Sequence, residues 1–433
     1  MTAATDPPKR LARADLLALA PLRGLLQRPL ASYYLLLASA GLLLVIGLIM
    51  VFSATMVKAY EDSGNAFSAI LKQTLWALVG LVAFWLAQRT SVRTYRRLGR
   101  PMLVVTCLML AILLIFPAAR SGAIHTDGLW IGVGEFQFQP SEFMKFAFLL
   151  WAAVVLVRAG PKIGLWRELA VPLFPVAALV FLLVGYNDLG SMLCLVAMFF
   201  GLLWAAGVRL RVFAAMAAVA ALGAVALTLV ASYRMERIVS FGSPENYADD
   251  WGYQAIQGYF AIADGGWFGV GLGESRQKWE WLPNGHNDFI FALIAEELGV
   301  VGCTVVLVLF MVLTYSGMRI ASRVSDPFRR LTAAGLTMWI AAQAIINIGG
   351  VVGLLPITGL PLPLISDGGT ALVVVLGAIG MLASFARAEP AAARALRARN
   401  PGRLMRVLWA PLPPRPRSDR RPGSTGTTRS DKS

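Results

Sequence analysis

Residues 33–53 read YYLLLASAGLLLVIGLIMVFS, and no charged side chain interrupts these 21 positions. A helix needs about 20 consecutive apolar residues to cross the hydrocarbon core of a bilayer. The rest of the chain has the same character, because apolar types make up 57% of its 433 residues and the four charged types only 15%. Soluble domains carry about 25% charged residues. The composition therefore excludes a soluble globular protein and predicts an integral membrane protein.

Nine further apolar segments follow the first one. Lipid offers no hydrogen-bond partner to a backbone, so we expect every one of these segments to be a helix. The sequence thus predicts an all-α polytopic membrane protein with ten transmembrane helices, at about residues 33–53, 68–87, 101–118, 142–158, 168–185, 190–207, 211–231, 289–316, 330–354 and 369–386.

The basic residues are not spread evenly over the connections between these helices. Residues 88–100 hold five arginines and no acidic residue, and the connections near 158–168, 209–211 and 319–330 are also basic. Lys and Arg are retained on the cytoplasmic side of a membrane, so both termini are predicted to be cytoplasmic. The net charge of +15 is then explained by topology and by contact with membrane lipids rather than by nucleic-acid binding.

The chain divides into three parts: a basic cytoplasmic segment at 1–32, the membrane domain at 33–386 and a tail at 387–433. The tail holds twelve Lys or Arg against three acidic residues, together with repeated prolines, which is typical of a disordered polybasic segment. The three cysteines, Cys107, Cys194 and Cys303, lie inside apolar runs. Their positions argue against a disulfide framework and against a thiolate metal site.

Two segments on the predicted outer side are expected to be structured. Residues 232–288 make a 57-residue connection between predicted helices 7 and 8, and this segment is rich in Trp, Tyr and Phe. Such side chains favour the membrane surface, so we expect a large structured extracellular loop. The Gly- and Pro-rich residues 355–368 are expected to form a re-entrant or cavity-lining loop, because broken backbone at membrane depth must be satisfied by neighbouring protein.

Ionisable residues beside or inside the spans are candidate functional residues, because their burial in a membrane is costly. Glu142 and Lys145 are three positions apart at the start of the fourth span and share one helix face. A structural ion pair and a contact with substrate are equally compatible with this spacing. Glu296 and Glu297 lie inside the eighth span, where they need partners or a hydrated cavity.

Asp288 directly precedes the eighth apolar span and follows His286 and Asn287. An aspartate in this place either caps the helix or supplies a functional carboxylate near the outer interface, and both interpretations remain open. The outer loop also carries candidate substrate-binding side chains, namely Arg234, Arg237, Gln254, Gln257, Arg276, Lys278 and His286. Five glycines between residues 265 and 273 allow a backbone nest for phosphate or sugar, whereas a dinucleotide-binding fold is excluded because no strand precedes them.

Four motifs occur in order along the chain: FQPSEFMK at 138–145, QGYFAIADGGWFGVGLGES at 257–275, LPNGHNDFIFALIAEELG at 282–299 and QAIINIGGVVGLLPITGLPLPLIS at 343–366, the last followed by GGT at 368–370. With these motifs the chain resembles the shape, elongation, division and sporulation (SEDS) family, of the FtsW/RodA type, over roughly residues 33–386. The HND triplet at 286–288 and the basic tail are most similar to the actinobacterial cell-division members.

The resemblance implies a ten-helix peptidoglycan glycosyltransferase in the bacterial cytoplasmic membrane, at the division septum. Such an enzyme polymerises lipid II on the outer face with inversion at the anomeric centre. It works with a class B penicillin-binding protein, a transpeptidase, among other divisome proteins. The family's essential aspartate falls on Asp288, and its Glu and Lys fall on Glu142 and Lys145. Two positions depart from the family pattern, Leu129 where an Arg is usual and Asp367 before the GGT sequence.

The implied chemistry agrees with the residues. One carboxylate at the interface can act as general base toward the acceptor hydroxyl, and cations can stabilise the charge that develops on the diphosphate leaving group. No cofactor is assigned from the sequence, and a divalent cation, Mg²⁺ or Mn²⁺, could share the task of binding the diphosphate. Two alternatives stay open, a lipid II flippase and a non-catalytic scaffold that activates the penicillin-binding protein.

Overall fold

The structure, a computed structural model, describes residues 24, 27–116, 118–121, 124–133, 136–160, 166–209, 211, 213–215, 217–218, 222–223, 225, 241–247, 252–279 and 281–398. Within these residues, eight helices are long and apolar enough to cross a membrane. They are α3 (Ala31–Ser63), α4 (Ser68–Arg89), α5 (Val92–Ile115), α6 (Pro140–Ala159), α8 (Leu189–Ala206), α12 (Ile290–Arg323), α13 (Pro327–Val351) and α14 (Thr370–Arg387). Helix α7 (Trp166–Asn187) contains a shorter apolar stretch, Val171–Tyr186.

Nine of the ten predicted spans therefore correspond to helices of the structure, of which eight meet the length and hydropathy expected of a membrane span. The predicted span at 211–231 falls mostly outside the described residues. Helix α5 begins at Val92, nine residues before its predicted start at 101. The Ser91 side chain caps this earlier start by accepting a hydrogen bond from the Thr94 amide, and Pro101 is accommodated inside the helix.

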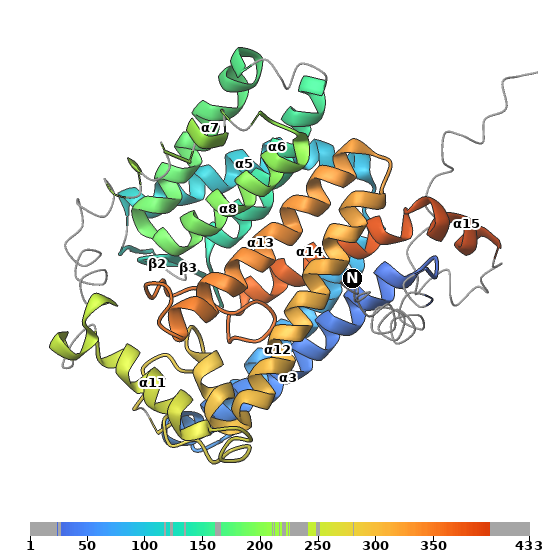
Figure 1. Cartoon of the computed structure of the whole chain (residues 1–433). Helices are drawn as coiled ribbons and strands as arrows, with labels where there is room; N and C mark the ends of the chain where they lie inside the picture. Colours follow the sequence, from blue (N-terminus) through green and yellow to red (C-terminus); the bar gives the residue numbers. More distant parts are fainter. Residues whose placement is uncertain are drawn as a thin grey trace, which may run out of the picture.

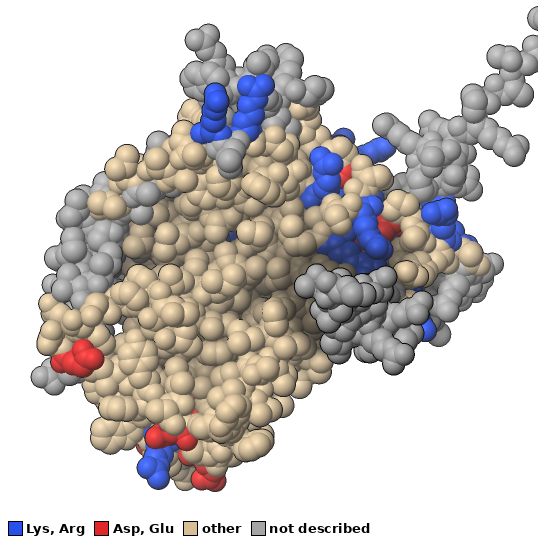
Figure 2. Space-filling model, in the orientation of Figure 1, with Lys and Arg blue, Asp and Glu red and all other residues tan. Residues whose placement is uncertain are grey.

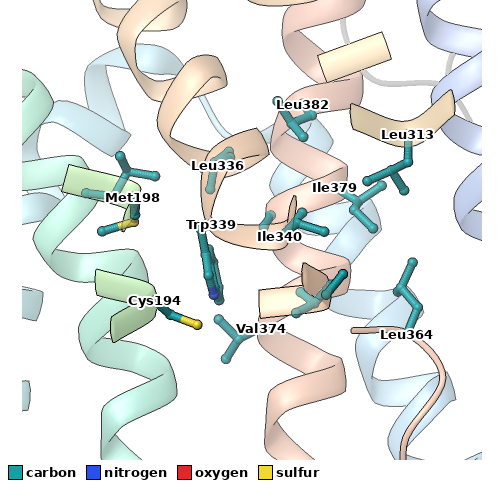
Figure 3. Packing of buried hydrophobic residues seen from close by; sticks show 14 of the residues in the cluster. Cys194, Met198, Leu313, Leu336, Trp339, Ile340, Leu364, Val374, Ile379 and Leu382 are labelled. Carbon is teal, nitrogen blue, oxygen red and sulfur yellow. The ribbon is translucent and has the colours of Figure 1, made fainter. Parts of the chain in front are cut away.

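The helices pack into a bundle whose centre is formed by α6, α13 and α14 (Figure 1). Helix α12 runs beside α3, α14 packs on α4, and α13 packs on α8. Figure 3 shows side chains from α8, α13 and α14 meeting in the core, where Trp339 points toward Cys194 and Val374. By contrast, only 17% and 22% of the apolar 18-residue windows of α4 and α12 are buried, as expected of segments that face lipid.

The segment before α6 forms a small sheet that the all-α prediction did not include. Its strands are β1 (Arg120–Ser121), β2 (Ile124–Asp127), β3 (Trp130–Val133) and β4 (Phe136–Phe138), and they pair in this order, each antiparallel to the next. Gly128, with φ 54°, and Leu129 make the two-residue turn between β2 and β3. A positive φ at the first turn position suits the twist of a hairpin. Leu129, one of the departures from the family pattern, thus occupies a hairpin turn.

The start of the predicted disordered tail also differs from the structure. Residues Pro390–Ala398 form helix α15, in which Ala392, Ala393 and Leu396 are buried. These three apolar residues share one face of the helix, so burying that face compensates for ordering the segment. Residues 399–433 lie outside the described part of the chain.

Candidate active site

Asp288 ends the segment 232–288, called the outer loop here after its predicted position. It lies two residues before the start of α12, and its exposed fraction is 8%. It lines a small pocket with about 10 Å³ of water-accessible space, which is room for about one water molecule. The pocket is formed by the start of α12, the end of α13 and the loop that follows α13: Asp288, Phe289, Ile346, Asn347, Gly350, Val351, Ile357, Thr358, Gly359 and Leu360. The expected cavity-lining role of the Gly- and Pro-rich loop is thereby confirmed.

Asn347 on α13 connects the two walls of this pocket. Its Nδ2 donates one hydrogen bond to the backbone carbonyl of Asp288, at 2.8 Å, and another to that of Leu360, at 2.7 Å. Both donors of one amide are therefore used to hold the start of α12 against the loop. Gly359, with φ 73°, leaves the space beside the carboxylate open, because a Cβ there would lie 4.0 Å from Asp288 Oδ2.

A second set of bonds joins the residues around Asp288 to the start of α14. Ser366 Oγ donates to the carbonyl of Asn287 at 2.5 Å, and the amide of Asp367 donates to the carbonyl of His286 at 3.1 Å. Gln73 on α4 donates to the carbonyl of Ser366 at 3.3 Å. The HND triplet is thus fixed from two sides by elements that are remote in sequence.

Glu142 and Lys145 form an ion pair of 2.6 Å between Oε1 and Nζ, and both side chains are fully buried. Lys145 Nζ also donates to Gln343 Oε1 at 3.1 Å, and Trp339 Nε1 donates to the same oxygen at 2.9 Å. Gln343 Nε2 in turn donates to the carbonyl of Pro361 at 2.9 Å, next to the pocket-lining Leu360. The pair therefore reaches the Asp288 pocket through one amide and the loop, and neither charge lines the pocket.

Asn347 and Gln343 are the site residues whose roles sequence reasoning missed. In the sequence, two amide side chains four positions apart on one face of an apolar span indicate that this face is polar and meets other protein. Nothing in that spacing identifies the carbonyls that they bind. Asp188 is the N-cap residue of α8, and its side chain accepts a hydrogen bond from the Ser191 amide at 2.9 Å.

Glu296 and Glu297 have the partners that their depth in the span requires. Glu296 accepts from Ser275 Oγ at 2.5 Å and from the Arg276 amide at 2.7 Å, and Glu297 accepts from Ser53 Oγ on α3 at 2.6 Å. These carboxylates hold the outer loop and α3 against α12. This arrangement is a structural clamp, and it stands away from the Asp288 pocket.

The glycine-rich part of the outer loop braces a break in α12. At Gly299 the helix has φ 65° and ψ −165°. The carbonyls of Glu296 and Glu297 accept from the amides of Val270 and Gly271, at 2.9 and 3.1 Å, and the amides beyond the break donate back to the loop carbonyls of Gly266 and Trp267. The amides of Val270 and Gly271 are therefore engaged with α12, and Gly271 does not contribute its amide to a backbone nest for phosphate or sugar.

Replacing Gly299 with Ala should destabilise the protein and loosen the loop. The positive φ disfavours a side chain, and the added Cβ would meet backbone atoms of Gly269 and Trp267. We expect a loss of about 1–3 kcal/mol in the free energy of unfolding, measured as a fall in Tm and as faster proteolysis near residues 266–271. Gly377→Ala is the matched control, because a Cβ at this helical position of α14 has open space. Equal Tm values for the two variants would contradict the bracing role.

The other candidate binding residues are dispersed. Gln254, on α11 (Tyr253–Gly265), donates to the carbonyl of Pro283 at 2.9 Å and so supports the approach to Asp288. The Arg276 side chain is exposed, whereas Lys278 is buried and its Nζ donates to the carbonyl of Gly273. Gln257 is half-buried on α11 and does not line the pocket. Arg234 and Arg237 lie outside the described residues.

His286 and Asp367 lie in a shared electrostatic environment beside the pocket. Burial lowers the pKa of His286 below its ordinary value of 6.5, with Asp367 opposing this shift and Lys58 adding to it. Burial raises the pKa of Asp367 above 3.8, with His286 and Lys72 opposing that shift. The imidazole two residues before Asp288 is therefore neutral at pH 7.

This environment predicts an acid-labile contribution to stability. Because the folded-state pKa of His286 is depressed, the unfolded chain takes up its proton first, so this stability is present above pH 6.5 and is lost as pH falls through the lowered pKa. Between about pH 7.5 and about pH 5.5 the Tm of the native protein should fall further than that of His286→Gln, which lacks the titrating group. Parallel losses in both proteins would contradict the burial of a neutral imidazole.

Within the described part of the chain, no three His, Cys, Asp or Glu side chains gather into a group that would hold a metal ion. The site that the structure does assemble consists of one carboxylate in a small, mainly apolar pocket, connected to a buried ion pair through Gln343 and the loop after α13.

Comparisons with known proteins agree on one family. The family described as cell cycle protein FtsW/RodA/SpoVE matches residues 33–390. The probable peptidoglycan glycosyltransferase FtsW of Mycobacterium tuberculosis is 46% identical over 389 residues, which cover 90% of this chain and 74% of the relative. The stage V sporulation protein E of Bacillus subtilis is 39% identical over 350 residues, covering 80% of this chain and 94% of the relative.

Solved structures give the same result for the fold. One similar structure comes from a study of how a peptidoglycan synthase complex coordinates polymerization and crosslinking. That chain is 26% identical to this one with a TM-score of 0.61, and the match covers 79% of this chain and 97% of the solved chain. The rod shape determining protein RodA of Thermus thermophilus shares the fold, at 24% identity and a TM-score of 0.59. The match covers 82% of this chain and 96% of the RodA chain. The chain belongs to the FtsW/RodA/SpoVE family of cell cycle proteins.

Proposed function

We propose that this protein is an inverting peptidoglycan glycosyltransferase that polymerises lipid II on the outer face of the bacterial cytoplasmic membrane, at the division septum. The names of its relatives support the activity, and the description of its family as cell cycle proteins supports a role in division. The observation that carries the assignment of the site is the Asp288 carboxylate, which lines a pocket between two membrane helices and a re-entrant loop. A carboxylate in this position is suited to a substrate that lies partly in lipid and partly in water.

In the proposed reaction, Asp288 accepts the proton of the acceptor sugar hydroxyl as its oxygen attacks the anomeric carbon of the donor. A new C–O bond forms on one face of that carbon while the bond to the diphosphate breaks on the other, so the configuration inverts. The electron pair leaves with undecaprenyl diphosphate. Among the candidate cations, Arg276 is exposed at the outer loop and available to the diphosphate, whereas Lys278 is engaged with the loop backbone.

The proposed topology has ten spans with both termini in the cytoplasm. The distribution of charge over the surface supports this orientation. Figure 2 shows most of the visible Lys and Arg along the upper and right-hand edges of the molecule, a broad central band almost without charge, and acidic side chains together with a basic one at the lower edge. Basic residues favour the cytoplasmic side, and the Asp288 pocket lies at the opposite end of the bundle from the basic starts of α5 and α13.

We further propose that the protein works with a class B penicillin-binding protein that cross-links the new strand. Its relationship to a chain studied in a peptidoglycan synthase complex supports this. Helices α12 and α13 are the proposed contact for the partner's single membrane span. Helix α12 offers a suitable face, because Val301, Val308 and Met311 are exposed and apolar.

Reconstitution in liposomes tests the function. The purified protein, its penicillin-binding partner, and the two together are each given lipid II on one membrane face, and glycan strands and translocated lipid II are both measured. Strand synthesis is the expected result. Translocation without strands would establish a flippase instead, and strand synthesis by the partner alone would leave this protein as a scaffold.

A further inference from the structure

A basic pocket lies at the end of the bundle opposite Asp288. It has a volume of about 300 Å³ and lies between the start of α5 and the end of α6. Its lining consists of four arginines and two valines: Arg93, Arg96, Arg97, Val154, Val157 and Arg158. Arg158 follows Glu142 by 16 residues on α6, which places it about 24 Å farther along the helix axis. The pocket is thus separate from the proposed catalytic site.

Only one of the four arginines has a carboxylate partner among the residues that the structure describes. Arg96 makes two bonds to Asp326, of 3.1 and 3.0 Å, and lies over the ring of Phe328. Asp326 is itself engaged as the N-cap of α13, where it accepts from the Arg329 amide. Arg93, Arg97 and Arg158 have no ion pair within the described part of the chain.

Arg93, Arg97 and Arg158 are exposed, so water weakens their mutual repulsion, but three like charges around one cavity that lack an acidic partner among the described residues still favour an anion between them. Guanidinium groups are especially suited to phosphate, because their planar fork donates two parallel hydrogen bonds to two oxygens. The charge of the pocket therefore selects an anion, and the side-chain type favours a phosphate group.

The surroundings of the pocket select a phosphate that is attached to lipid. Val154 and Val157 make one wall apolar. On α5, Val104 and Leu108 follow Arg97 by 7 and 11 positions, so they lie on the same helix face, directly beyond the charge. Both are exposed, at 58% and 59%. An arginine at the bundle end with an apolar strip leading away from it matches a headgroup joined to acyl chains.

We infer that this pocket binds an anionic glycerophospholipid of the cytoplasmic leaflet, with its phosphate held by Arg93, Arg97 and Arg158 and an acyl chain lying along α5. Basic pockets between membrane helices on the cytoplasmic side recognise such headgroups. The assignment to that leaflet rests on the proposed topology, whereas the binding itself does not depend on the enzymatic activity.

The test uses the purified full-length protein in detergent, with phosphatidylglycerol as the probe and phosphatidylcholine as the zwitterionic reference. Native mass spectrometry and titration give the number of bound lipids and the Kd. The native protein should bind phosphatidylglycerol more tightly than phosphatidylcholine. The triple variant Arg93→Gln, Arg97→Gln, Arg158→Gln should weaken phosphatidylglycerol binding by at least about tenfold, because each basic residue near an anionic headgroup contributes to its binding.

A matched triple variant removes the same charge outside the pocket: Arg100→Gln, Arg330→Gln, Arg394→Gln, all of which are exposed. It should retain the binding of the native protein. Equal weakening in both triples, or no preference for phosphatidylglycerol, would overturn the proposal. Equal competition by inorganic phosphate would overturn the lipid assignment in favour of a free-anion site. If the first triple does not fold, the single variant Arg97→Glu serves in its place, with thermal unfolding as the check of folding.

Discussion

Asp288→Asn is expected to lower strand synthesis from lipid II by at least about 10²-fold, the lower end of what general base catalysis contributes. Asn has nearly the shape of Asp, and the N-cap residue of α12 is Phe289, with no side-chain cap hydrogen bond, so the exchange removes the proton acceptor without removing a helix cap. The bond from Asn347 is also retained, since Asn347 donates to the backbone carbonyl of residue 288. The measurement is the initial rate of glycan polymerisation by the purified complex, at equal protein and partner concentrations.

Two controls separate this loss from a structural defect. The Tm and the binding of the penicillin-binding partner should remain close to those of the native protein. Asp264→Asn makes the same exchange at an exposed position on α11 of the same outer segment, and it should leave the rate unchanged. Near-normal polymerisation by Asp288→Asn would exclude the carboxylate as the base and leave a purely structural role at the start of α12.

Lys145→Met should cause the largest loss of stability of any single exchange at the site. The substitution leaves Glu142 fully buried without its cation, and removing one partner of a buried ion pair costs about 3–5 kcal/mol. Gln343 also loses a donor to its Oε1. We expect a fall in Tm in detergent, together with reduced polymerisation, since Gln343 supports the loop that lines the pocket.

The double variant Glu142→Leu, Lys145→Met tests whether the uncompensated charge is the cause. Replacing both partners with apolar residues of similar size removes the buried charge, and such exchanges are often neutral for stability. Most of the lost Tm should therefore return in the double variant. A double variant as unstable as Lys145→Met would contradict this explanation. If the Tm returns while polymerisation stays low, the polar pair itself is needed to shape the pocket.

The amino-acid sequence by itself determined the class of the protein and the positions of its helices. Hydropathy is a local property, and a bilayer sets a minimum helix length for every apolar segment, so α4, α6, α8 and α14 lie close to their predicted ranges, whereas α3 continues to Ser63, ten residues beyond its predicted end. The pairing of Glu142 with Lys145 was one of two open interpretations, because a spacing of three places both on one helix face. The resemblance of the motifs to a known family also pointed to Asp288 before any geometry was known.

The tertiary structure decided how these parts act on one another. Asn347 contacts Asp288 across 59 positions of the chain, and Gln343 contacts Lys145 across 198. The break at Gly299 likewise depends on loop amides that lie almost thirty residues earlier in the chain. Periodicity and hydropathy report which face of a segment is apolar, but they do not report which remote carbonyl or carboxylate a buried amide will meet. Those partners are selected only when the helices pack, because every polar group enclosed in the bundle must then find a hydrogen bond there.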